Sequence, residues 1–119
     1  MPHTTRYNRG DVVLVPFPFT DLTSVKQRPA VIVSPDHLNA QRDDRVLAAI
    51  TSQVPTQLGA DEILLSAADL GGTGLLKTSA IKLGKLVTIH QDLVRRKIGV
   101  LPTPVLVQAL RQLQWFFNP

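Results

Sequence analysis

The stretch "KQRPAVIVSP", which runs from Lys26 to Pro35, combines a buried strand with a cation at its entrance. Its centre is a run of small and β-branched apolar residues, the kind that fills the interior of a sheet. Pro29 and Pro35 bracket this run and predict a short strand between turns. Arg28 stands directly before the first proline, which biases its backbone toward extended angles. We therefore expect a rigid strand with a guanidinium group at its edge.

Further apolar segments at close spacing predict more short strands. The prolines at positions 16 and 18 are expected to end the first one, and Gly84 is expected to form a bulge or bend in the last. Three glycines within residues 70–74 predict a turn with positive φ angles. The expected strands cover residues 12–15, 29–35, 45–52, 61–66 and 79–89, the last as one or two strands.

The C-terminal segment "TPVLVQALRQLQWFF" has helical periodicity instead. Thr103 is predicted as the N-cap, with Pro104 at the first helical position. Apolar residues from Leu106 to Phe117 recur on one face, which we expect to pack on the sheet. A shorter helical turn is expected near residues 91–95. Short strands followed by a terminal helix predict a mainly β fold, a small barrel of five to seven strands with a helical cap.

Composition limits the class of protein. A chain of 119 residues, 44% hydrophobic and 18% charged, fits a single domain over residues 1–119 that buries its own core. It contains no cysteine, which excludes disulfides and thiolate metal sites. The polar N-terminus lacks the apolar stretch of a signal peptide, and the apolar runs are too short for a membrane span, so we expect a cytoplasmic protein. The net charge of +4 is compatible with a polyanionic partner but does not require one.

Several common chemistries lack their sequence patterns. His3, His37 and His90 are far apart and do not have the spacing of helical metal ligands, so no metal is expected. The segment "GGTG" lacks the Lys-Ser/Thr that completes a phosphate-binding loop, and no serine stands in a nucleophile elbow. We therefore expect neither a nucleotide cofactor nor a serine nucleophile.

Polar residues at strand ends are the remaining candidates for a site. Arg28 opens the second strand, and Thr51, Ser52 and Gln53 close the third. If these two strands are antiparallel neighbours, Arg28 and Thr51 share one edge of the sheet. Each feature also has an ordinary structural interpretation. A strand-end arginine is often a solvated charge, and hydroxyl residues after a strand often bond to nearby backbone. A lysine in the outward register of a strand, as Lys82 is, often faces solvent.

The order of these segments resembles that of the MazF/PemK-like toxins, the endoribonucleases of type II toxin–antitoxin pairs. The resemblance runs through "RGDVVLVPFPF", "QRPAVIVSP", "VLAAITSQ", "SAIKLGKLVTI" and "KIGVLP", and so covers nearly the whole chain. It implies an SH3-like small β-barrel of the CcdB/Kid/MazF type with a C-terminal helix, assembled as a homodimer. It also implies metal-independent cleavage of single-stranded RNA at short sequence motifs, and neutralisation by a cognate antitoxin.

The resemblance also implies roles for particular residues. Arg28 and Thr51 match the family's catalytic arginine and threonine. We expect a second group to contact the substrate, namely Lys26, Ser52, Gln53 and Lys82. Because RNA carries its own nucleophile, the 2′-OH, such an enzyme needs charge stabilisation and proton transfer more than a metal. The expected products are a 2′,3′-cyclic phosphate and a 5′-OH.

This chain departs from the family pattern at two places. The segment "FPFTDLTSVKQ" lacks the glycine and glutamate that many members carry in the loop between the first two strands. Some PemK-type members have an Arg-x-Asp pair in the fifth-strand block, where this chain has Lys82 and Gly84. The positive charge is kept and the carboxylate is absent. Two other functions stay open: a toxin of the same fold that binds a protein without nuclease activity, as the gyrase poisons do, and a general nucleic-acid-binding barrel.

Overall fold

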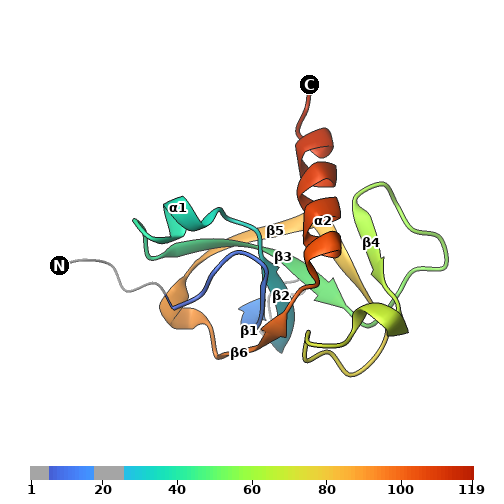
Figure 1. The fold of residues 1–119 in the computed structure, drawn as a ribbon, viewed down its shortest axis with the longest axis horizontal. Helices are drawn as coiled ribbons and strands as arrows, with labels where there is room; N and C mark the ends of the chain where they lie inside the picture. The colour runs from blue at the N-terminus through green and yellow to red at the C-terminus, as the bar shows by residue number, and fades with distance from the viewer. Residues whose placement is uncertain (1–5, 18–25) are drawn as a thin grey trace.

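The computed structural model describes residues 6–17 and 26–119. The six strands of this part of the chain form one antiparallel sheet, with a C-terminal helix beside it (Figure 1). Its strands stand in the order β4-β5-β3-β2-β1-β6, so β4 and β6 are its edges. The strands are β1 (Asp11–Phe17), β2 (Lys26–Ile32), β3 (Asp44–Thr51), β4 (Glu62–Leu65), β5 (Ser79–His90) and β6 (Arg96–Val100). The predicted mainly β fold is confirmed, as a six-stranded half-barrel with a C-terminal helix.

Helix α2 (Thr103–Phe116) covers one face of this sheet and closes the larger core. Val105 and Ala109 are buried among side chains of five strands, with Leu106 and Leu113 packed beside them. A smaller core on the other face is closed by Tyr7 and Val94. The predicted helical face is wrong at its end, because Phe116 and Phe117 are exposed where α2 projects beyond the sheet (Figure 1).

The start of α2 also differs from prediction. Its N-cap is Pro102 rather than Thr103, and the cap makes no side-chain hydrogen bond. The Leu106 N–H donates to the Pro102 carbonyl at 3.0 Å, which is the first helical bond. Pro104 therefore lies in the first turn, where the missing N–H costs no hydrogen bond.

The end of β1 and the start of β2 differ from prediction, and each strand runs through a proline that was expected to stop it. β1 runs through Pro16 to Phe17, and β2 begins three residues before Pro29. The reason is that both prolines lie where one side of the strand has no partner. Pairing of β1 with β6 ends at Leu14, and pairing of β2 with β3 begins at Ala30. A proline on an unpaired side removes no ladder hydrogen bond, so the strand continues.

The bulge expected near Gly84 is present. β5 is one strand, and its register against β3 shifts so that Ala49 pairs with Lys82 whereas Ala48 pairs with Leu86. The helical turn expected near residues 91–95 is the 3₁₀ turn η2 (Gln91–Leu93). Two short helical elements were not predicted, α1 (Asp36–Asn39) and η1 (Ala67–Asp69). In the described part of the chain, no helix has the length and apolar character needed to cross a membrane.

Candidate functional site

A cavity of about 600 Å³ lies where three strand ends converge. β2 begins there, β3 ends there and β5 begins there, and the loop before β5 forms a further wall. Ala49 of β3 is among its lining residues. The cavity is therefore a product of the topology, which brings together segments that are far apart in the sequence.

Arg28 of β2 and Thr51 of β3 line the same cavity. The two strands are antiparallel neighbours, as the sequence analysis required, and Ala30 pairs with Ala49. Arg28 lies two residues before Ala30 and Thr51 two residues after Ala49, so this register brings them to the same end of the strand pair, where both line the cavity. The Thr51 hydroxyl accepts a hydrogen bond from the Gln53 N–H at 3.1 Å. Because that contact occupies a lone pair, the hydroxyl proton can be donated into the cavity.

Five of the six predicted site residues line this cavity. They are Arg28, Thr51, Ser52, Gln53 and Lys82. Lys26 does not line it, since it lies exposed at the start of β2, opposite Phe17. His90 is at the far end of β5, where its Nδ1 accepts from the Asp92 N–H.

Three more cations, which were not predicted from the sequence, also line the cavity. They are Lys77, Lys85 and Arg96. Lys85 is three residues from Lys82, a spacing that points to opposite faces in a regular strand, and the β5 bulge lets both reach the same space. Arg96 comes from β6, which joins the site through a long-range pairing with β1. With Arg28 and Lys82, five cations surround the cavity, and no Asp or Glu is among its described lining residues.

A family model for the PemK-like, MazF-like toxins of type II toxin–antitoxin systems matches residues 8–117. The chain belongs to this family. Among curated proteins, none matches it in sequence.

Solved structures of the family share the fold. MazF from Deinococcus radiodurans is 20% identical over 92% of this chain and 94% of its own, with a TM-score of 0.70. An endoribonuclease in complex with its cognate antitoxin, from a mycobacterial species, is 18% identical over 91% of each chain, with a TM-score of 0.69. The Mycobacterium tuberculosis toxin MazF-mt6 is 21% identical over 87% of this chain and 95% of its own, with a TM-score of 0.64.

The two departures from the family pattern have different outcomes. The first falls mostly on residues 18–25, which lie outside the described residues. At the second, Gly84 does not line the cavity. A Cβ at Gly84 would come within 2.3 Å of Asp61 Oδ2. A carboxylate from the turn before β4 therefore occupies the space that a side chain at position 84 would need.

The wall formed by the loop before β5 is held against β6 by close backbone contacts. The Val100 N–H donates to the Gly72 carbonyl at 2.8 Å. Gly72 and Gly74 have φ angles of 81° and 77°, as the predicted glycine turn requires. A Cβ at Gly99 would lie 2.3 Å from the Gly72 oxygen, so the two backbones touch only because that side chain is absent. Lys77 lies further along the same loop and lines the cavity.

We expect Gly99→Ala to destabilise the fold by about 2 kcal/mol, because the loop must move away from β6. Chemical denaturation measures the effect. Gly71→Ala is the matched control, since a Cβ there meets nothing within 4 Å. Equal effects of the two substitutions would contradict this account of the wall.

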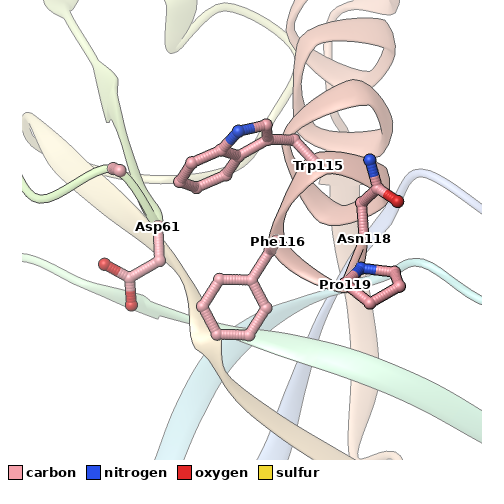
Figure 2. A pocket seen from close by; sticks show the side chains of 6 residues that line it. Asp61, Trp115, Phe116, Asn118 and Pro119 are labelled. Atoms are coloured by element: carbon pink, nitrogen blue, oxygen red, sulfur yellow. The ribbon is translucent and has the colours of Figure 1, made fainter.

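A second hollow of about 510 Å³ lies between the end of α2 and the turn before β4 (Figure 2). Trp115 and Phe116 extend from the helix end, and Asp61 lies on the facing segment. This hollow has no lysine or arginine among its described lining residues, so it does not share the cationic character of the first cavity.

Nowhere in the described chain do three or more His, Cys, Asp or Glu side chains gather in a way that could hold a metal ion.

Proposed function

We propose that this family member is the toxin component of a type II toxin–antitoxin system and a metal-independent, sequence-specific endoribonuclease of single-stranded RNA, with mRNA as its cytoplasmic substrate. The observation that carries the proposal is the meeting of Arg28, Thr51 and Lys82 in one cationic cavity. The shared fold of the mycobacterial endoribonuclease supports it. The same arrangement is not needed by a toxin that only grips a protein.

The proposed reaction uses the 2′-OH of the substrate as nucleophile. Its oxygen forms a bond to the adjacent phosphorus and loses its proton, while the bond from phosphorus to the 5′ oxygen breaks and that oxygen gains a proton. The products are a 2′,3′-cyclic phosphate and a 5′-OH. The forked donors of Arg28 match the non-bridging phosphate oxygens, where negative charge grows in the transition state. The Thr51 hydroxyl donates to one of those oxygens.

The remaining lining residues suit the flanking parts of an RNA chain. Lys77, Lys85 and Arg96 supply positive charge for neighbouring phosphates, so binding should weaken as salt rises. No aromatic residue is among the described lining residues, and the apolar contacts come from Leu75, Leu76 and other aliphatic side chains. Recognition by this site therefore rests on phosphate contacts and base edges, with Ser52 and Gln53 placed for hydrogen bonds.

The proposed partners besides RNA are a cognate antitoxin protein and a second copy of this chain in a homodimer. The mycobacterial endoribonuclease was solved in complex with its cognate antitoxin, and MazF from Deinococcus radiodurans together with MazE. The end of α2 leaves Trp115 and Phe117 62% and 64% exposed. Exposed aromatic side chains at one helix end support contact with another protein chain.

The proposal is tested by incubating the purified protein with a long single-stranded RNA in the presence of EDTA. We expect discrete fragments whose ends are a 2′,3′-cyclic phosphate and a 5′-OH, with no cleavage of single-stranded DNA, which lacks the nucleophile. Intact RNA after incubation with folded protein, across several RNA sequences, would contradict the nuclease function. Binding without cleavage would favour a nucleic-acid-binding barrel. The absence of both binding and cleavage would favour a toxin that acts on a protein.

We expect Thr51→Val to lower kcat about 10²-fold with little change in KM, because the isosteric side chain cannot donate to the charged phosphate oxygen. Thr51→Ser, which keeps the hydroxyl, should retain most of the activity. Single-turnover cleavage of a short RNA measures both. A Thr51→Val variant as active as Thr51→Ser would remove the hydroxyl from the mechanism.

A further inference from the structure

The cavity-lining cation Lys82 is held by a carboxylate that is not among the lining residues. Lys82 on β5 stands directly opposite Glu62 on β4 in the strand register. The Lys82 Nζ lies 3.0 Å from Glu62 Oε2, and the two side chains are 29% and 12% exposed. An ion pair that is mostly shielded from solvent is less screened by salt than one on an open surface. The edge strand β4 thus contributes an acidic side chain to a cation of the proposed site.

Glu62 is itself held by the turn before β4. The Gly59 N–H donates to Glu62 Oε1 at 2.7 Å, and the Glu62 N–H donates back to the Gly59 carbonyl at 3.1 Å. The Gly59 N–H and the Lys82 ammonium lower the pKa of the Glu62 carboxyl below its ordinary value. A carboxylate in this state stays ionised at neutral pH and is a poor proton acceptor. Its geometry suits a fixed anchor for a neighbouring cation.

Such an anchor changes what Lys82 can do. A free lysine side chain loses about 2 kcal/mol of rotamer freedom when it is fixed on a ligand. A partner that fixes it beforehand reduces this cost at binding. An ammonium has three N–H donors, so a contact with Glu62 leaves donors for a phosphate oxygen. The carboxylate also offsets the repulsion between Lys82 and the other cations that line the cavity.

We propose that Glu62 is a positioning residue for RNA cleavage, which holds the Lys82 ammonium in the orientation that meets a substrate phosphate. The proposal rests on the ribonuclease function proposed above: Lys82 makes the contact with the substrate, and Glu62 sets the direction of that contact. It also gives a role to a carboxylate on β4 in a chain whose β5 has glycine at position 84.

The test compares Glu62→Gln with Asp61→Asn, two neutral replacements at neighbouring positions. Asp61 lines the second hollow rather than the cationic cavity, and its carboxylate lies against Gly84 instead of Lys82, so it serves as a matched control (Figure 2). If only long-range charge mattered, both variants would bind RNA more tightly, because each removes a negative charge. The proposal predicts the opposite for Glu62→Gln, with KM raised about tenfold and kcat little changed. Asp61→Asn should show an unchanged or lower KM.

A second pair of variants separates positioning from folding. In a Lys82→Met background, Glu62→Gln should have no further effect on KM, whereas a merely structural role would lower activity equally in both backgrounds and lower the Tm as well. A wild-type KM in Glu62→Gln, or the same tenfold loss in the Lys82→Met background, would overturn the proposal.

Binding is followed in parallel by the fluorescence anisotropy of a fluorescein-labelled single-stranded RNA. If wild-type protein binds this RNA without cleaving it, the nuclease function fails while the Lys82–Glu62 proposal is still decided by the dissociation constants of the same variants. If wild-type protein does not bind it, both fail.

Discussion

Arg28→Ala is expected to lower kcat for RNA cleavage by about 10³-fold, the loss found when a donor that stabilises transition-state charge is removed. Arg28 lies at the start of β2 and lines the cavity together with Thr51, from a strand rather than from a loop. Its backbone is held by the β1–β2 ladder, in which Arg28 pairs with Val15. Gel-based cleavage of RNA under single-turnover conditions measures the effect.

Two further variants show whether the forked geometry or the charge matters. Arg28→Lys keeps the charge but not the paired donors, so we expect it to recover about tenfold of the loss and no more. Arg96→Ala removes another arginine that lines the same cavity, from β6. It should raise KM and leave kcat nearly unchanged, because its proposed contact is with a flanking phosphate.

The Arg28→Ala protein should remain folded. Arg28 is exposed, and surface substitutions of this kind change stability by about 0.5 kcal/mol or less. The thermal midpoint therefore serves as the control for the cleavage assay. If the folded Arg28→Ala protein keeps more than a tenth of wild-type kcat, the guanidinium is not the group that stabilises the transition state.

The meeting of Arg28 with Thr51 could be predicted from sequence because it depends only on two adjacent strands. One antiparallel pairing places the start of one strand beside the end of the next, and the pairing of Ala30 with Ala49 establishes it. Strand positions were predictable for a similar reason, since a short run of β-branched residues between prolines and glycines favours a strand over a helix. Errors at Pro16 and Pro29 arose where a strand has a partner on one side only, which depends on tertiary pairing.

The missed part of the site depends on contacts between distant segments. Arg96 reaches the cavity because β6 pairs with β1 although more than 80 positions separate them in the chain. Lys85 reaches it because of the bulge, whose existence was predicted near Gly84 but whose effect on side-chain direction was not. The ion pair of Lys82 with Glu62 requires the β4–β5 register, which no local pattern reveals. Sequence periodicity identifies the two faces of a single strand. The site, in contrast, is built from residues of several strands that become neighbours only in the folded sheet.

Arg45 offers the largest expected effect on stability. It is completely buried and lies near the start of β3, at the opposite end of that strand from Thr51. Its Nε donates to the Tyr7 carbonyl at 3.0 Å, and its Nη2 donates to Gln91 Oε1 at 3.0 Å. Its Nη1 donates to two further backbone carbonyls, at 2.7 and 2.9 Å. Burial lowers the pKa of the guanidinium, an effect that Asp43 partly offsets. One side chain thus joins the N-terminal segment, β3 and η2.

We expect Arg45→Met to lower the free energy of unfolding by about 3–5 kcal/mol, because a methionine of similar length leaves several buried acceptors without a donor. Arg45→Lys should recover only part of this, since an ammonium cannot reach all the acceptors in their planar arrangement. Urea denaturation at constant m-value measures both. Arg42→Met, the same replacement at an exposed position three residues earlier, should cost about 0.5 kcal/mol or less.

Arg45→Met also separates an effect on stability from an effect on catalysis. Because Arg45 is distant along β3 from the cavity, the fraction of Arg45→Met protein that is folded at low temperature should cleave RNA with a nearly normal kcat. Arg28→Ala should show the reverse, a normal thermal midpoint with almost no cleavage. A loss of less than 1 kcal/mol in Arg45→Met would mean that water replaces the guanidinium at these acceptors, and the N-terminal segment would then be held by its other contacts. A normal stability with lost cleavage would instead connect Arg45 to the site through β3.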